Sequence, residues 1–435
     1  MSGSAARLAA LDTLRAVRRG RLLDGALQTH ATRESPRDIA WLHELVYGTL
    51  RLRARLDHVL AQSVHGGLSS LEADVLDVLR LGAYQLLEMG GVPDYAAVSQ
   101  AVELAKQANG PAAASLVNAV LRSVQRKGAG SFPAFEDDPL GNLTTWGSHP
   151  RWLVERWIRR WGAQETRRLV ERDNERPDVY VRPIGMDVEE ARVLLASAGI
   201  ETERAGPSPD TFRLGAAADV RAALSTVPAV VQDPAAALVV RYADLPRDGV
   251  VADLCAAPGG KALAVAGMRD SGLVAAGDVS VRRLARLREN AQRPGAPPVH
   301  VFAGDARRPP LRAADAVLLD VPCTGTGTLR RHPDARWRIG PDDLAALVLL
   351  QREILEAASC LVRPDGILVY ATCSLEEEEN GGQVDAFLEA HPEFEPAPGG
   401  DVDASCLDAA RRLFVRPQEH GTDGAFAARM RRTRV

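Results

Sequence analysis

Two cysteines lie in polar turns that directly follow apolar, strand-like runs. Segment 320–327 reads Asp-Val-Pro-Cys-Thr-Gly-Thr-Gly and contains Cys323, and segment 371–374 reads Ala-Thr-Cys-Ser and contains Cys373. A single buried cysteine is usually inert core. Two cysteines at strand ends instead favour chemistry, because a thiolate whose pKa is lowered by helix N-termini or positive charge is an effective nucleophile.

A thiol together with a carboxylate at these predicted strand ends favours methyl transfer to a pyrimidine. Carbon 5 of a cytosine is too weak a nucleophile to attack a methyl-sulfonium until a thiolate has added to carbon 6. Asp320 could hydrogen-bond the N3/N4 edge of the base and stabilise the electron-rich intermediate. The residues alone do not rank Cys323 and Cys373, since DNA cytosine methyltransferases use a Pro-Cys cysteine.

A glycine-rich turn predicts a nucleoside cofactor. Segment 253–261 reads Asp-Leu-Cys-Ala-Ala-Pro-Gly-Gly-Lys and joins a strand-like run to a helical one, which makes a cradle for a polar ligand. The pattern is neither G-x-G-x-x-G nor a P-loop, because Ala262 follows Lys261. Asp278 and Asp305 end the next two runs. Either alone is as often a helix cap, but together they favour ribose and base contacts.

The elements that position these residues form three predicted parts. Helical periodicity fills residues 5–126 and predicts an all-α domain, and the Gly- and Pro-rich stretch 128–150 is interpreted as a linker. A helix beginning near Pro150 places Leu153, Trp157 and Trp161 on one face, with arginines on the others. Runs at 179–182 and 211–214 around a helix at 188–198 suit a small α+β module.

Beyond residue 230, strand-like and helical runs alternate, which predicts a doubly wound parallel sheet. The strand-like runs are 249–254, 272–277, 299–303, 316–319 and 366–372. Both cysteine motifs would then lie at the carboxyl edge of the sheet.

Composition limits the class of protein. A chain of 435 residues exceeds one ordinary core. A net charge of -4 argues against coating nucleic acid by bulk charge, so RNA would need local basic surface. With no apolar run long enough for a bilayer and no signal peptide pattern, we expect a cytoplasmic protein without membrane contact. The five cysteines form no C-x-x-C pair, which disfavours disulfides and metal sites.

Taken together, the three motifs at 253–261, 320–327 and 371–374 resemble those of the RsmB/Sun family, which are bacterial 16S ribosomal RNA cytosine-C5 methyltransferases. Segments 231–235, 330–337 and 420–424 also match the family. The N-terminal helices, with segments 38–57 and 117–122, resemble the NusB-like RNA-binding domain that the family carries. The resemblance therefore covers most of the chain.

The resemblance implies S-adenosylmethionine as the cofactor and assigns roles to the motif residues. Asp278 would hold the ribose, Asp305 the adenine side, and Asp320 would lie between cofactor and target base. Cys373 would be the nucleophile, and Cys323 would assist product release. The remaining cofactor contacts would come from the turn itself: Cys255, Ala256, Ala257, Pro258, Gly259, Gly260 and Lys261.

The resulting prediction is a multidomain methyltransferase. It has a NusB-like helical domain at 1–130, a small α+β RNA-binding or linker module at 145–228, and a Rossmann-like methyltransferase domain at 229–435. We expect a monomer that acts on small-subunit ribosomal RNA. The alternatives are a non-catalytic NusB-like RNA-binding or antitermination factor, and a methyltransferase for another RNA such as tRNA. An amino-group methyltransferase is disfavoured, since Asp-Val-Pro-Cys replaces its usual Asn/Asp-Pro-Pro-Tyr.

Overall fold

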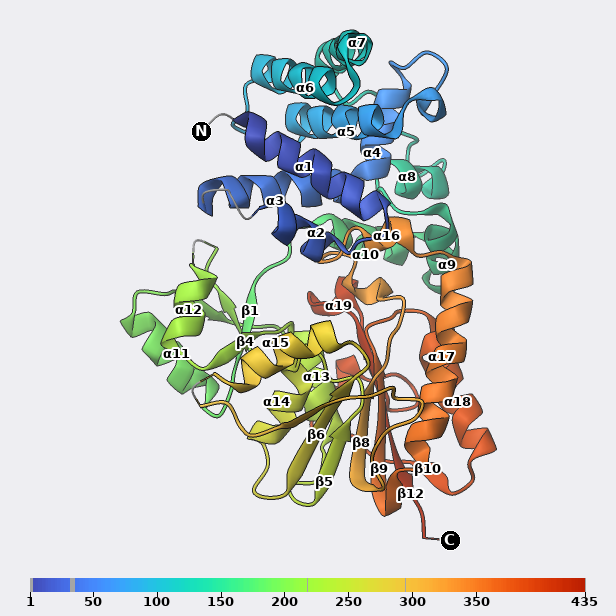
Figure 1. The fold of residues 1–435 in the computed structure, drawn as a ribbon. Helices are drawn as coiled ribbons and strands as arrows, with labels where there is room; N and C mark the ends of the chain where they lie inside the picture. The colour runs from blue at the N-terminus through green and yellow to red at the C-terminus, as the bar shows by residue number, and fades with distance from the viewer. Residues whose placement is uncertain (1–2, 32–35, 217, 294, 435) are drawn as a thin grey trace. The chain divides into compact units, whose positions relative to one another are not determined.

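The computed structural model describes residues 3–31, 36–216, 218–293 and 295–434. Packing divides the chain into two compact units (Figure 1). The helical unit contains residues up to Glu175 together with Leu329–Arg338, and the second unit contains Arg176–Thr328 and Ile339–Val435. The three domain boundaries predicted from sequence stay predictions. None of the described helices is long and apolar enough to cross a membrane.

The helical unit contains the predicted all-α domain and extends beyond it. Its α-helices among the described residues are α1 (Gly3–Arg18), α2 (Leu23–His30), α3 (Pro36–Arg51), α4 (Arg53–Ala61), α5 (Ala73–Leu87), α6 (Asp94–Asn109), α7 (Pro111–Lys127), α8 (Pro139–Thr145), α9 (Arg151–Trp161), α10 (Ala163–Asn174) and the short α16 (Ala335–Arg338). Leucines and valines spaced three and four apart build one continuous core for helices α1–α7. In α9, Leu153 and Trp157 are buried as the periodicity predicts.

The predicted linker at 128–150 is wrong in its second half, because α8 lies within it. Asp138 caps this helix by accepting a hydrogen bond from the Gly141 amide, and Pro139 suits the first helical position. Leu143 and His149 are buried. The Pro, Gly and Asn residues that indicated a linker belong instead to a short capped helix in the second half of this stretch.

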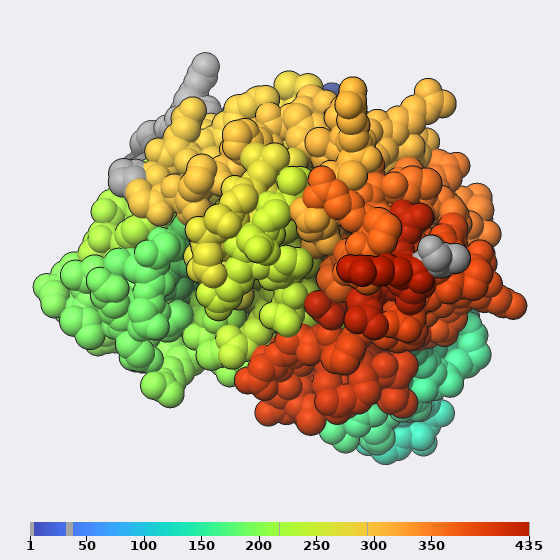
Figure 2. All heavy atoms as spheres, turned by 90° about the horizontal axis from the view of Figure 1, so that it is seen from below, coloured from blue at the N-terminus to red at the C-terminus, as the bar shows by residue number. Residues whose placement is uncertain are grey.

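The second unit begins with a four-stranded antiparallel sheet, as expected for the small α+β module. Its strands are β1 (Tyr180–Pro183), β2 (Thr202–Arg204), β3 (Phe212–Leu214) and β4 (Ala229–Val231), in the order β2-β3-β1-β4. Helices α11 (Val188–Ser197) and α12 (Val220–Thr226) pack on an apolar cluster that includes Val181, Leu195 and Phe212. In Figure 2 this module, coloured green, lies on the side of its unit away from the red C-terminal residues.

The larger sheet is the predicted doubly wound sheet, extended at one edge. Its order is β10-β12-β9-β8-β5-β6-β7, and β11 pairs with β12. The parallel strands are β5 (Val250–Asp253), β6 (Leu273–Asp278), β7 (His300–Ala303), β8 (Ala314–Asp320) and β9 (Val362–Thr372). The helices between them are α13 (Pro234–Ala243), α14 (Gly260–Gly267), α15 (Val281–Ala291) and α17 (Pro341–Ser359), which precede β5, β6, β7 and β9.

This connectivity decides where a site can form. The chain runs outward from β5 through β6 to β7, then returns to lay β8 on the other side of β5. Ligands of open α/β sheets bind at such a reversal, outside the carboxyl ends of the strands. Asp253 and Asp320 end the two strands that flank the reversal.

The antiparallel edge was not predicted from the sequence. Strands β10 (Phe394–Pro396), β11 (Leu413–Val415) and β12 (Ala425–Arg432) form it, and α18 (Gly381–Ala390) precedes them. Strand β12 pairs with β9 from Phe426 opposite Thr372 to Arg431 opposite Ile367. It thereby protects the strand that leads into the Cys373 motif.

Candidate active site at the carboxyl edge of the large sheet

The turn after β5 forms a cradle whose acids lack part of their hydrogen bonding. Asp253 is buried, and its Oδ1 accepts the Cys255 amide at 3.3 Å, whereas its Oδ2 has no hydrogen-bond partner among the described residues. Burial, and next the charge of Asp320, raise the pKa of Asp253 to about 7. A buried carboxylate oxygen without a hydrogen bond lowers the stability of the fold unless a ligand donates a hydrogen bond to it.

The glycines of the turn let the backbone reach the start of α14. Gly259 has a φ of 107°, in the region that L side chains rarely adopt. A Cβ on Gly260 would stand 2.8 Å from Gln232 Nε2, so the turn packs directly on the segment before α13. Burial and the charge of Asp253 raise the pKa of Cys255, so this third cysteine of the motifs is held as a neutral thiol.

Asp278 and Asp305, which were predicted to hold the ribose and the adenine side of the cofactor, differ from one another. Asp278 at the end of β6 is buried; its Oδ1 accepts the Ser280 amide at 2.7 Å and Arg283 Nη2 at 2.9 Å, and its Oδ2 lacks a partner within the described chain. Asp305 is half-buried, and Arg307 binds it with its backbone amide and its side chain. That contact lowers the pKa of Asp305.

Lys261 and Asp320 form an ion pair that the sequence did not predict. Lys261 Nζ donates to Asp320 Oδ2 at 2.7 Å and connects the cofactor turn to the Cys323 motif. Burial alone would lower the pKa of Lys261, but the charge and hydrogen bond of Asp320 outweigh burial and raise it. The ammonium therefore stays charged near the cysteines, where it favours a thiolate.

Cys323 and Cys373 meet, as their predicted positions at one sheet edge require. Their Sγ atoms lie 3.4 Å apart, and the described cysteines form no disulfide. The hydrogen bond to Cys373, together with burial, raises the pKa of Cys323 far above that of an ordinary thiol. Cys323 is therefore held as a protonated thiol next to the Cys373 sulfur.

Glu379 holds the two cysteine loops together. It is fully buried in the one-turn helix η3 (Glu377–Glu379), and its Oε1 accepts the Thr324 amide at 2.8 Å and Gln351 Nε2 at 2.9 Å. The Thr324 hydroxyl donates to the other carboxylate oxygen and lies 3.1 Å from Ser374 Oγ. Residues adjoining Cys323 and Cys373 are thus fixed by one carboxylate.

Backbone bonds add to this connection. The Gly327 amide donates to the Cys373 carbonyl at 3.0 Å, and Gly327 in turn accepts the Gly424 amide at 2.7 Å. A Cβ on Gly327 would lie 2.7 Å from Gly424 Cα, so only glycine permits this approach. The matched segments 231–235 and 420–424 also meet, where the Asp423 amide donates to Asp233 Oδ1 at 3.1 Å.

The remaining matched segment, 330–337, belongs to the helical unit. Arg336 is buried there, and its guanidinium donates to the Asp173 carbonyl at 2.6 Å, Asn174 Oδ1 at 2.7 Å and the Arg51 carbonyl at 3.1 Å. Trp337 Nε1 donates to the Leu50 carbonyl at 2.7 Å.

Sequence reasoning missed Asp253, the Lys261 pairing and Glu379 as contributors to this site. Asp253 had a usable signal, since it is an acid at the end of the first predicted parallel strand. Glu379 had only a weak one, since it is the fourth glutamate in a run that would ordinarily be solvated.

Comparison with known proteins gives one consistent picture. The family model described as 16S rRNA methyltransferase RsmB/F matches residues 243–431, the NusB family model matches 4–126, and a RsmF/B-like ferredoxin-like domain matches 149–221. A probable ribosomal RNA small subunit methyltransferase B of Bacillus subtilis is 35% identical over 90% of both chains. Its counterpart in Vibrio cholerae is 36% identical and is covered to 93%, with 94% of this chain aligned.

Solved structures share the fold. The crystal structure of PH0851 superposes with a TM-score of 0.81 at 26% identity and 99% coverage of both chains. NSun6 from Pyrococcus horikoshii, solved with SFG, has a TM-score of 0.57 at 20% identity and covers 66% of this chain and 99% of its own.

Proposed function

The chain belongs to the RsmB/F family of ribosomal RNA methyltransferases, and from that premise we propose that it methylates carbon 5 of a cytosine in small-subunit ribosomal RNA. The observation that carries the proposal is the pair of cysteine sulfurs 3.4 Å apart, beside the Lys261–Asp320 ion pair at the carboxyl edge of the sheet. Addition to a pyrimidine ring and release from it need two such groups.

The cofactor of the proposed reaction is S-adenosylmethionine, which supplies an electrophilic methyl group when bound. The cradle fits it, because Asp253 Oδ2 and Asp278 Oδ2 are buried acceptors without partners at the ends of adjacent strands. Asp278 would hold ribose hydroxyls, Asp253 would face the cationic amino-acid end, and the turn from Cys255 to Lys261 would surround the rest. Asp305 would hold the adenine side after exchanging part of its contact with Arg307.

Cys373 is the proposed nucleophile. The charged Lys261 and the Cys323 thiol, whose Sγ lies 3.4 Å from Cys373 Sγ, provide a cation and a hydrogen-bonding partner beside this sulfur. Addition forms a bond from Cys373 Sγ to carbon 6 and moves an electron pair toward the N3 edge. Asp320 and Lys261 would hydrogen-bond that edge, so that carbon 5 becomes nucleophilic.

Cys323 is the proposed group for product release. After methyl transfer, carbon 5 still carries its proton, and the Cys373–carbon 6 bond must break to restore the ring. Cys323 Sγ lies 3.4 Å from Cys373 Sγ, so the Cys323 thiol can pass its proton to the departing Cys373 sulfur while the Cys323 sulfur takes up the proton from carbon 5. Glu379 acts as a positioning residue, since it fixes the loops rather than touching the base.

Trapping of the RNA adduct tests the two roles. Cys373→Ala should abolish methyl transfer and form no covalent complex. Cys323→Ala should add and methylate, then stall, so that an RNA–protein adduct survives denaturing electrophoresis when S-adenosylmethionine is present. Cys360→Ala is the matched control, because that cysteine is exposed at the end of α17.

The result that would overturn the assignment is equally sharp. An adduct that accumulates with Cys373→Ala and disappears with Cys323→Ala reverses the roles, as in the DNA enzymes. Methyl transfer that persists in both single variants removes covalent catalysis from the proposal. Bisulfite mapping of small-subunit RNA from cells lacking the gene identifies the cytosine.

A further inference from the structure

The helical unit contains a cavity of about 330 Å³ that has no part in the chemistry described above. Helices α1, α3, α4 and α5 line it together with segment 329–338, and its walls combine apolar groups such as Leu14 and Leu50 with charged ones. This size lies within the range of small-molecule sites. We call this cavity the arginine pocket. Its lining includes Arg18, Arg53, Arg80, Asp334, Trp337 and Arg338.

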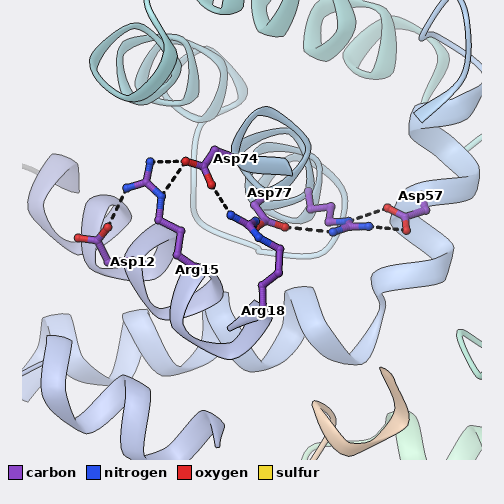
Figure 3. A network of polar contacts seen from close by, with 7 residues as sticks. Asp12, Arg15, Arg18, Asp57, Asp74 and Asp77 are labelled. Carbon is purple, nitrogen blue, oxygen red and sulfur yellow. Dashed lines mark hydrogen bonds and ion pairs between the residues drawn. The ribbon is translucent and has the colours of Figure 1, made fainter. Parts of the chain in front are cut away.

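Two of these arginines are already neutralised. Arg80 donates to both oxygens of Asp57, at 2.7 and 2.8 Å, and to Asp77 at 3.0 Å. Arg18 is paired with Asp74 and Asp77, and Figure 3 shows this chain of acids and arginines between α1, α4 and α5. Because these two guanidinium groups are already ion-paired, few of their N–H donors are left for a ligand.

Arg53 is different, because no hydrogen bond or ion pair engages its guanidinium anywhere in the described ranges. The group lies over the Trp337 ring, 5.2 Å from the centroid, and the hydrogen bond from Trp337 Nε1 to Leu50 fixes that ring. Burial, and next the charge of Arg80, lower the pKa of Arg53, while Asp57 and Asp77 oppose the shift. The half-buried guanidinium of Arg53 therefore has N–H donors available for the acceptor atoms of a ligand.

Asp334 provides the opposite kind of group. Its side chain is only 4% exposed, yet its nearest charged partner in the described chain is Arg338, whose Nε lies 3.9 Å away, beyond hydrogen-bond distance. A buried carboxylate that receives no hydrogen bond calls for a donor. The pocket therefore offers donors at Arg53 and acceptors at Asp334.

From this pairing we infer that the arginine pocket binds a single unstacked guanine base of RNA. Guanine presents the acceptors O6 and N7 on one edge, which match an arginine fork, and N–H donors on the neighbouring edge, which match a carboxylate. Sequence-specific RNA recognition uses such splayed bases stacked against aromatic or guanidinium planes. A bare phosphate fits less well, since Asp334 would repel it.

The inference rests on the RNA substrate of the proposed function but is tested without methyl transfer. The full chain is titrated with labelled uridine hexamers, with and without one central guanosine, at matched salt and without cofactor. We expect the guanosine hexamer to bind about tenfold more tightly, near the low end of what one bidentate contact gives. If the guanosine hexamer binds more tightly but a separate assay with S-adenosylmethionine finds no methylation of small-subunit RNA, the proposed function is refuted and the inference about the pocket stands.

Conservative variants separate base recognition from general attraction. Arg53→Lys keeps the charge but loses the fork, and Asp334→Asn loses acceptor capacity; each should reduce the preference to about twofold or less. The control Arg19→Gln, at an exposed site outside the pocket, should keep the preference. Equal binding of both hexamers to the unaltered protein, or an undiminished preference in Arg53→Lys, overturns the inference. Tighter binding of both hexamers by Asp334→Asn, without a change of preference, would indicate a phosphate site and also overturn it.

Discussion

The cysteine loops and the cofactor cradle lie at the same sheet edge but differ in how complete they are. Around the cysteines, Glu379 satisfies Thr324, Gln351 and the neighbouring hydroxyls without any ligand. In the cradle, Asp253 and Asp278 each keep one buried oxygen without a partner in the described structure. The loops that contain the proposed nucleophile are thus held in place by the protein alone, whereas the cradle reaches full hydrogen bonding only with a ligand.

Removing the Glu379 carboxylate should give the largest effect of the tests that follow. Glu379→Ala leaves the buried Thr324 amide without its acceptor and Gln351 Nε2 with only the Pro322 carbonyl, and it removes the carboxylate that connects the two loops. We expect about a 10²-fold loss of kcat, the size expected for roughly 1 Å of misplacement. The free energy of unfolding should fall by about 3 kcal/mol or more.

Glu379→Gln is the matched control for that variant. The amide oxygen can still accept the Thr324 N–H, so most of the stability and activity should return. The measurements are single-turnover methylation and urea unfolding. If the alanine variant lost stability but kept full kcat, the loops would not depend on this carboxylate for their positions.

Asp278→Ala tests the incomplete half of the comparison. Loss of charge-assisted bonds to two ribose hydroxyls should weaken S-adenosylmethionine binding by about 1.5–3 kcal/mol. Isothermal titration calorimetry with S-adenosylhomocysteine measures this directly. Unchanged affinity would contradict the assignment of Asp278 to the ribose. An equal loss of cofactor affinity in Glu379→Gln would show that the cysteine loops also contribute to cofactor binding.

Asp253 predicts a dependence of stability on pH in the ligand-free protein. Its folded pKa of about 7 lies above the unfolded value near 4, so the folded state binds the extra proton between those values. The free energy of unfolding therefore falls as pH rises from about 4 to 7, by at most about 1.4 kcal/mol per pH unit. Asp253→Asn should remove this contribution. Denaturation of both proteins at pH 5, 6, 7 and 8 checks the difference, and parallel curves would refute it.

Asp305→Ala should have the smallest effect. The carboxylate is half-buried and already bound by Arg307, so a ligand gains little by replacing that contact. We expect a loss of cofactor affinity below about 1 kcal/mol, measured in the same calorimetric series. A loss as large as that of Asp278→Ala would place Asp305 among the acids that await a ligand.

Much of the fold could be predicted because its signals are local. The apolar runs that end at Asp253, Asp278 and Asp320 are strands in the structure, and helical periodicity located the N-terminal bundle. The antiparallel edge was missed, because β12, which reads Ala-Phe-Ala-Ala-Arg-Met-Arg-Arg, alternates poorly and is specified by its pairing with β9. Packing of this kind overrides weak local preference.

The site divides in the same way. The motifs brought Cys323 and Cys373 to one edge, since parallel strands share their carboxyl ends. The Lys261–Asp320 pair and the Glu379 contacts join residues 28 to 59 positions apart, and no spacing rule indicates such pairings. The meeting of Cys323 and Cys373 could be predicted from the sequence, but the side chains that bind and position the site residues could not.

A truncation illustrates why the position of segment 329–338 matters. A chain beginning near Asp138 would be expected to keep cofactor binding and lose RNA affinity. It would also lack the Leu50 and Arg51 carbonyls that accept from Trp337 and Arg336, leaving two buried donors without those acceptors. Point variants in the arginine pocket are therefore the cleaner test of RNA contacts.

Segment 329–338 also determines when the helical unit can finish folding during translation. Arg336 bonds to the Arg51 carbonyl across 285 residues, so the helical unit acquires its last buried donors only after most of the chain has left the ribosome. At about 5–20 residues per second, translation of those 285 residues takes on the order of 15–60 s, during which the N-terminal helices wait for their last component. Completion of the helical unit thus depends on synthesis of the chain as far as Arg338.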